Sequence, residues 1–175
     1  QPESFVDESL KGIVLAHGDM LKFSEENTRA VVRSDAPVQD KVAIVTGGGY
    51  GHLPVFLGYV GRGLCDGVAV GNVFTSPSCD AIVAAAKATN SDAGVLFLFG
   101  NYMGDSMNFD MASEMLDMED IPCAIVKAAD DVASAPRSDY KNRRGVGGIF
   151  FPYKIAGAKA ERMASLDEVR DIAVQ

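Results

Sequence analysis

Two glycine-rich segments of this sequence each end in a side chain that can take up a proton. The first, GGGYGH, runs from Gly47 to His52, and the second, GNYMGD, runs from Gly100 to Asp105. A neutral imidazole can accept a proton from a hydroxyl group or polarise a carbonyl group, and a carboxylate is also a proton acceptor. If the two segments are neighbours in the fold, His52 and Asp105 face one crevice and form a candidate catalytic pair.

Each of these segments follows an apolar run that is typical of a strand covered on both faces. The runs are KVAIVT (Lys41–Thr46) and GVLFLF (Gly94–Phe99). In open α/β sheets, ligands bind beyond the carboxyl ends of the strands, which is where both segments lie. We expect the glycine cluster to end the first strand at once. We also expect Asp105 to be the N-cap of a helix over Ser106–Met118, whose N-terminus favours an ionised carboxylate.

The remaining chain alternates between helix and strand patterns. Further strands are predicted at Thr28–Arg33, Leu64–Gly71 and Pro122–Lys127. Further helices are predicted from Ser4 to near Gly18, at Leu53–Val60, at Ala81–Ala88 after a Thr75–Pro77 cap, at Ile149–Arg162, and after a capping box formed by Ser165 and Glu168. The polar segment Ala128–Gly148 is long for a connection. This order predicts a three-layer α/β fold, with a mainly parallel sheet and helices on both faces.

Composition excludes several classes of function. The chain has 175 residues and a formal net charge of -8, so its surface repels the phosphates of a nucleic acid. Its longest apolar run is far shorter than the ~20 residues of a membrane helix. Three cysteines without a CxxC pair argue against a zinc site or a disulfide framework. We therefore expect a cytoplasmic protein of one domain with no nucleic-acid, membrane or metal partner.

Nucleotide-binding loops do not fit the glycine segments. The GxGxxG pattern meets His52 or Pro54 where its last glycine belongs, and no lysine completes a GxxxxGK loop. Structural interpretations stay open: His52 can bond a loop carbonyl, and Asp105 can cap a helix without any further role. Arg143 and Arg144 can clamp an anion, contact a partner or be solvated. Five methionines near helical spacing are predicted to fill the core: Met103, Met107, Met111, Met115 and Met118.

A series of motifs resembles the substrate-binding subunit of dihydroxyacetone kinases. GGGYGHLP, NVFTSP, NYMGDSMNF, RRGVGG and KIAGAKAE occur in this order, and the resemblance extends from about Ser4 to Asp171. It implies an α/β fold, a homodimer and the binding of a small ketose. In the bacterial form of this family, phosphate passes from a phosphotransferase-system protein to a partner subunit carrying ADP, and then to the sugar. Related enzymes have a fused ATP-binding domain.

The resemblance also implies roles for individual residues. It places the substrate loop of the family on Gly49, Tyr50, Gly51 and His52, and its catalytic aspartate on Asp105. His52 and Asp105 would hydrogen-bond and deprotonate the ketose, readying a hydroxyl to attack the phosphoryl group. ATP or ADP with magnesium would come from the partner subunit or domain, so this chain would bind no cofactor itself.

The chain departs from the family pattern at three positions. The family reads GSGHEP where this chain has Tyr50 and Leu53, and it has a substrate-contacting lysine where this chain has Gly100. A second histidine of the family, which binds the ketone carbon covalently, lies in a later domain, so residues 1–175 are predicted to be the N-terminal half of such a subunit. Two alternatives follow. The protein can be a non-catalytic ketose sensor that acts as a regulatory coactivator, or a kinase for a four-carbon ketose that Gly100 helps to accommodate.

Overall fold

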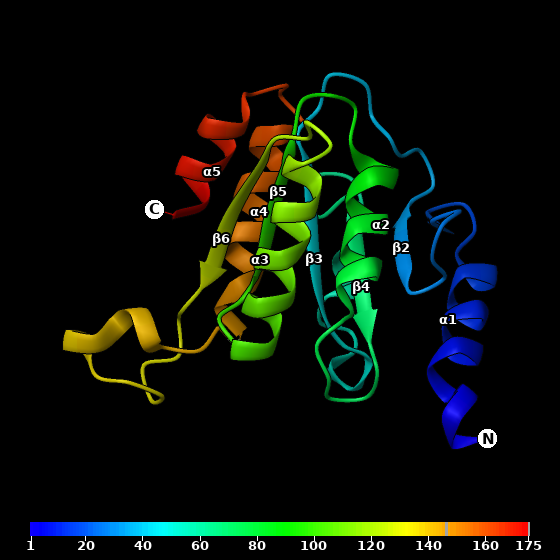
Figure 1. The fold of residues 1–175 in the computed structure, drawn as a ribbon, viewed down its shortest axis with the longest axis horizontal. Helices are drawn as coiled ribbons and strands as arrows, with labels where there is room; N and C mark the ends of the chain where they lie inside the picture. The colour runs from blue at the N-terminus through cyan, green and yellow to red at the C-terminus, as the bar shows by residue number, and fades with distance from the viewer. Residues whose placement is uncertain (146, 175) are drawn as a thin grey trace.

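A mixed six-stranded sheet forms the centre of the computed structural model, which describes residues 1–145 and 147–174 (Figure 1). The strand order is β1-β2-β4-β3-β5-β6. β3 pairs in parallel with both β4 and β5, and β5 pairs in parallel with β6, whereas β1 and β2 form an antiparallel edge. The strands are β1 (Leu21–Phe23), β2 (Ala30–Arg33), β3 (Ala43–Gly49), β4 (Gly67–Gly71), β5 (Val95–Gly100) and β6 (Cys123–Ala128). The prediction of a mainly parallel sheet is confirmed, but β1 was not predicted.

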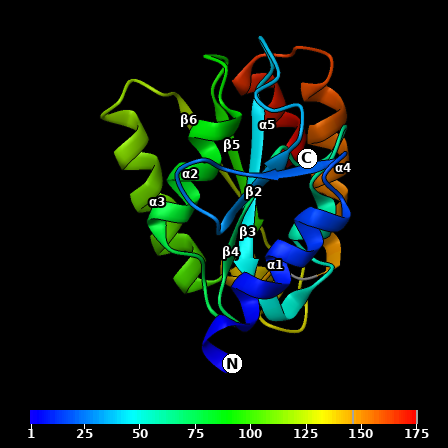
Figure 2. The ribbon, with the colours of Figure 1, turned by 90° about the vertical axis from the view of Figure 1, so that its right-hand side faces the viewer.

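Helices cover both faces of this sheet, as Figure 2 shows. They are α1 (Phe5–Ala16), α2 (Cys79–Thr89), α3 (Met103–Asp117), α4 (Phe150–Ala160) and α5 (Leu166–Val174). One face packs against α2 and α3, and the other packs against α4 and α5 over β3, β5 and β6. On that second face α1 covers β2 and β4. The three-layer architecture is therefore confirmed.

The side chains of β5 explain why its sequence is apolar throughout. Phe97 and Phe99 point towards α2 and α3, where both rings contact Phe109 at centroid distances of 5.3 and 4.1 Å. Leu96 and Leu98 point to the opposite face and pack with residues of α4. Because successive side chains of a strand alternate between faces, a strand between two helical layers must be apolar at every position.

The glycine cluster does not end β3 at Thr46, as the sequence predicted. The first three residues of the glycine cluster, Gly47, Gly48 and Gly49, continue β3 and pair in parallel with β4 up to the pair Gly49–Gly71. A Cβ atom on Gly47 would lie 2.9 Å from the carbonyl oxygen of Ala69, and one on Gly49 would lie 2.9 Å from the amide nitrogen of Phe74. The glycines therefore permit close approach of neighbouring backbone rather than a turn.

Helix starts were predicted less well than helix positions. Ser78, and not the Thr75–Pro77 segment, caps α2, since its hydroxyl accepts the amide of Ala81 at 3.3 Å. Residues 53–60 form turns with a single short 3₁₀ segment instead of a helix, and the Ser4 side chain bonds Glu8 rather than capping α1. The capping box at Ser165 is confirmed, because the backbone amide of Ser165 donates a hydrogen bond to the Glu168 carboxylate at 3.0 Å. Among the described residues, no helix is long and apolar enough to cross a membrane.

The prediction that five methionines in and just after α3 fill the core is wrong for four of them. Met103, Met107, Met111 and Met118 are between 52% and 82% exposed, and only Met115 is packed partly against the core. The buried face of α3 is formed by Phe109, Ala112 and Leu116, whose spacing of three and four residues places them on one side of the helix. Helical spacing alone did not show which stripe faces inwards.

Candidate active site

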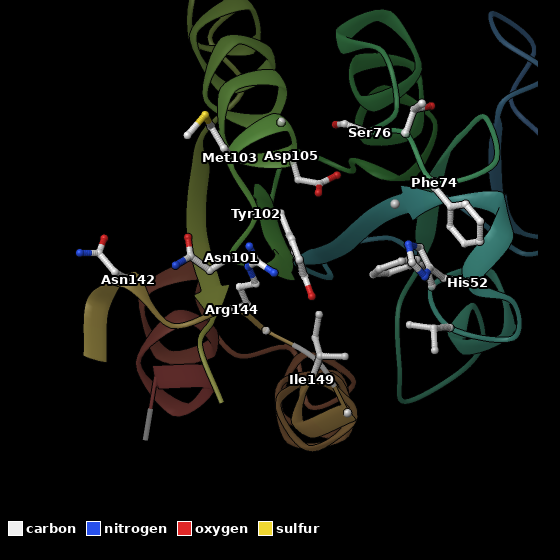
Figure 3. A pocket seen from close by; sticks show the side chains of 18 residues that line it. His52, Phe74, Ser76, Asn101, Tyr102, Met103, Asp105, Asn142, Arg144 and Ile149 are labelled. Atoms are coloured by element: carbon white, nitrogen blue, oxygen red, sulfur yellow. The ribbon is translucent and has the colours of Figure 1, made fainter. Parts of the chain in front are cut away.

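A cavity of about 910 Å³ opens at the carboxyl ends of the central strands. It is lined by residues of four segments: 48–56 at the end of β3, 74–76 after β4, 101–105 after β5, and 142–145 with 147–149 before α4. His52 and Asp105 both line it. Figure 3 shows the Asp105 carboxyl group pointing into the space that His52 borders from the other side. Since β3 and β5 are neighbours, the predicted common crevice is present.

Two aromatic rings hold the imidazole of His52 at the cavity wall. His52 follows β3 in a short 3₁₀ turn. Its ring forms T-shaped contacts with the rings of Phe56 and Phe74, at centroid distances of 6.0 and 5.3 Å. Both phenylalanines have positive φ angles, 70° and 60°, a conformation that costs energy for side chains other than glycine. The backbone around the cavity is therefore held in an unfavourable form that keeps both rings beside His52.

Replacing Gly48 with alanine tests this packing. A Cβ atom there would lie 2.1 Å from the Phe56 ring, so we expect the ring to move and the variant to lose about 1–3 kcal/mol of stability. The imidazole signals of His52 in an NMR spectrum should shift as well. Gly12→Ala is the control: it lies in α1, where a Cβ meets nothing within 4 Å, and should gain about 0.5–1 kcal/mol. Equal melting temperatures for the two variants would contradict the packing argument.

Asp105 is the third residue of α3, and Tyr102 rather than Asp105 occupies the N-cap position. Its carboxyl group is half-buried, and the Oδ1 atom has no hydrogen-bond partner among the described residues. Burial raises the pKa of Asp105, against the opposing effects of a Ser76 hydrogen bond, its own amide and the nearby His52. The prediction that Asp105 is the N-cap is therefore wrong, and burial outweighs the expected preference for the ionised form. The raised pKa makes the ionised carboxylate a stronger proton acceptor.

Other residues of the predicted substrate loop lie differently. Gly49 lines the cavity, but the Tyr50 ring turns towards α1, where it meets the Phe5 ring edge-on at 5.6 Å. Gly51 lies beneath Phe74, because a Cβ there would come within 2.7 Å of that ring. Neither Tyr50 nor Gly51 borders the cavity, so side-chain contact of Tyr50 with a ligand is not supported. The bulk of Tyr50 therefore leaves the cavity unobstructed.

Gly100 does not enlarge the cavity either. A Cβ atom at this position would lie 3.0 Å from the carbonyl oxygen of Gly145 and 3.2 Å from the Tyr102 ring. The missing side chain thus allows the segment before α4 to pack closely against the end of β5. The expectation that Gly100 makes room for a larger ligand is wrong, because this space is filled by backbone.

Sequence reasoning missed several cavity residues, among them Phe74, Ser76, Asn101 and Tyr102. The Ser76 hydroxyl accepts a hydrogen bond from the Asn108 side chain at 3.1 Å, which fixes it beside Asp105. The signal was available, because the NVFTSP and NYMGD motifs contain all four residues. Neutral side chains were passed over in favour of ionisable ones.

Comparison with known proteins places this chain in a family. The model of the Dak1 domain matches residues 11–175. The chain belongs to the Dak1 domain family. This Dak1 chain is 43% identical over 173 residues to the L-erythrulose kinase of Pectobacterium atrosepticum, covering 99% of this chain and 29% of that protein. It is 41% identical over 173 residues to the dihydroxyacetone-binding subunit DhaK of the PTS-dependent dihydroxyacetone kinase of Lactococcus lactis, covering 99% and 52%.

Solved structures confirm the fold of the Dak1 chain. The native dihydroxyacetone kinase of C. freundii superposes with a TM-score of 0.90 at 34% identity, over 99% of this chain and 32% of that one. The dihydroxyacetone kinase operon co-activator Dha-DhaQ superposes with a TM-score of 0.85 at 30% identity, over 95% and 50%. The chain thus spans between about a third and a half of the length of these relatives.

Proposed function

We propose that this Dak1 chain is the ketose-binding part of a kinase that phosphorylates a small ketose. The observation that supports the proposal is the shared cavity, into which the Asp105 carboxyl group points opposite His52. The pair takes up the proton of a ketose hydroxyl, and the oxygen forms a bond to phosphorus as the bond from phosphorus to the donor oxygen breaks. Phosphoryl transfer depends mainly on such positioning and on charge stabilisation.

The phosphoryl donor belongs to a partner in this proposal. A separate subunit or domain carries the nucleotide with Mg²⁺, either as ATP or as ADP that first receives a phosphoryl group from a phosphotransferase-system protein. In both cases the terminal phosphoryl group of ATP is transferred to the ketose, and ADP is left on the partner. A homodimer and a second domain with a covalent histidine complete the proposal and rest on the family resemblance. A cytoplasmic location is also part of it and rests on the composition and the cysteine pattern.

The decisive test is His52→Ala in the full-length protein, assayed with its phosphoryl-donating partner and dihydroxyacetone. We expect the turnover number to fall by about 10²- to 10⁴-fold, since a positioned acid–base group contributes about that much. His17→Ala is the matched control, because His17 is exposed at the end of α1 and does not line the cavity. Wild-type turnover in the His52 variant would overturn the proposed role.

A four-carbon ketose is a second candidate substrate. The cavity, at about 910 Å³, is at the upper end of the range of small-molecule sites, and a relative 43% identical to this chain is an L-erythrulose kinase. Comparing kcat/KM for dihydroxyacetone and erythrulose decides between the substrates.

A ketose sensor is the remaining candidate, and the likeness to the co-activator Dha-DhaQ favours it. Against it, the departures Tyr50 and Leu53 do not border the cavity, while His52 and Asp105 do. Ketose binding in calorimetry without any phosphorylation would support the sensor.

A further inference from the structure

A transferred phosphoryl group brings negative charge into a protein that is already acidic. The net charge is -8, and Asp105 adds a carboxyl group to the cavity itself. The Mg²⁺ on the partner would balance part of this charge, and phosphoryl-transfer enzymes commonly add a lysine or arginine beside the phosphoryl oxygens. Of the described residues, Arg144 is the one lysine or arginine that lines the cavity.

We propose that Arg144 is a catalytic residue that binds the phosphoryl group during transfer and the phosphate group of the product. This proposal rests on the proposed kinase function. Arg144 forms no covalent bond in this step. Its guanidinium donates hydrogen bonds to the non-bridging phosphoryl oxygens, while phosphorus moves from the donor oxygen to the ketose oxygen and the hydroxyl proton passes to the His52–Asp105 pair.

The backbone of Arg144 is fixed from both sides. Its amide donates to the Ser134 hydroxyl at 3.0 Å, and its carbonyl oxygen accepts the amide of Asp131 at 2.9 Å. The side chain of Asn101, at the end of β5, donates to the carbonyl oxygen of Arg143 at 2.8 Å. These bonds tie the segment before α4 to the end of β5, which leads into α3 and Asp105, so the backbone of Arg144 is fixed relative to the helix that carries Asp105.

The side chain of Arg144 is oriented but not neutralised. Its guanidinium carbon lies 6.0 Å from the centroid of the Tyr102 ring, a distance that allows a cation–π contact. Within the described part of the chain, no carboxylate forms an ion pair with it, and the residue is exposed. An arginine fork held in this way suits the planar recognition of phosphate oxygens.

The neighbouring arginine is placed differently. The Nε atom of Arg143 donates to the carbonyl oxygen of Ala135 at 2.9 Å, and Arg143 does not line the cavity. In Figure 3, Arg144 and Tyr102 lie across the cavity from His52, with Asp105 between the two sides. A ketose held by His52 and Asp105 would therefore share the cavity with Arg144 and not with Arg143.

The test compares Arg144→Gln, Arg144→Lys and the control Arg143→Gln in the full-length protein with its partner. We expect Arg144→Gln to lower kcat by about 10²- to 10³-fold and to weaken binding of the phosphorylated ketose by about tenfold or more, while affinity for the free ketose stays within about twofold. Arg144→Lys should recover part of the product affinity, because it keeps the charge without the fork. Arg143→Gln should stay within about threefold of wild type in each measurement.

Two failures can be told apart in this experiment. If wild type turns over and Arg144→Gln keeps both its kcat and its product affinity, the role of Arg144 is overturned and the kinase proposal stands. If wild type phosphorylates no ketose, the kinase proposal fails and the transfer role of Arg144 fails with it. Calorimetry with the phosphorylated ketose then still shows whether Arg144 binds a phosphate group. Melting temperatures of all variants show whether any loss reflects unfolding instead.

Discussion

Asp105→Asn should lower turnover by about 10²- to 10⁴-fold and at the same time stabilise the folded protein at neutral pH. The loss follows because an amide cannot accept the hydroxyl proton. The gain follows from the buried environment, which raises the pKa of Asp105 and therefore disfavours its ionised form in the folded state. Burial of the Asp105 carboxylate lowers the stability of the folded protein. A role in catalysis would explain why an aspartate occupies this position.

The sign of the pH dependence follows from the raised pKa. The favourable contribution of protonated Asp105 is complete below the pKa of the unfolded chain, whose ordinary value is 3.8. It is lost as pH rises through the higher folded-state pKa. Relative to Asp105→Asn, the wild type should therefore lose stability with rising pH until the carboxyl group is fully ionised.

Melting temperatures measured from about pH 3 to pH 7 test this prediction. The control is Asp110→Asn in the same helix, where the carboxylate is exposed and forms a 3.4 Å ion pair with Lys127. That variant should keep its turnover and show no such pH-dependent gain. An Asp105→Asn protein that is as stable as wild type at every pH would refute the argument from burial.

Asp66→Ala should destabilise the fold by about 3–5 kcal/mol, because it leaves the buried Lys41 ammonium without its close carboxylate partner, although Arg33 keeps its bonds to Asp35 and Glu161. Asp66 accepts the Arg33 guanidinium at 2.9 Å through Oδ1 and the Lys41 ammonium at 2.6 Å through Oδ2. The same Oδ2 accepts the amide of Ile44 at 2.8 Å. The three charged side chains are each at most 5% exposed, so water cannot replace the lost carboxylate.

Urea unfolding measures this loss directly. Glu161 keeps a 2.6 Å bond to Arg33 but lies 3.9 Å from Lys41, so the lysine is left poorly paired. Asp171→Ala removes the exposed ion pair with Arg170 and is expected to change stability by less than about 0.5 kcal/mol. If Asp66→Ala unfolds at the same urea concentration as Asp171→Ala, the network does not stabilise the fold as argued. Asp66 precedes β4, at the end of the sheet away from the cavity, so ketose affinity should be kept where the variant is folded.

Local sequence determined the elements that position the site. The fully apolar run of β5 could only be a strand buried between two layers, because both of its faces had to leave water. Parallel strands end at the same edge of a sheet, so the segments after Thr46 and Phe99 were expected together once the alternation of strands and helices was recognised. The Ser165–Glu168 capping box was also predictable, since both partners lie within one turn.

Only the tertiary structure decided which side chains reach the cavity. Strand order placed β3 beside β5, and nothing local encodes that neighbour. Tyr50 turns away because Phe5, 45 positions earlier, offers it an aromatic contact, and Arg144 rather than Arg143 faces the cavity because Asn101 and Ser134 fix the backbone between them. The direction of a loop side chain depends on partners brought together by folding, and so does the desolvation that raises the pKa of Asp105.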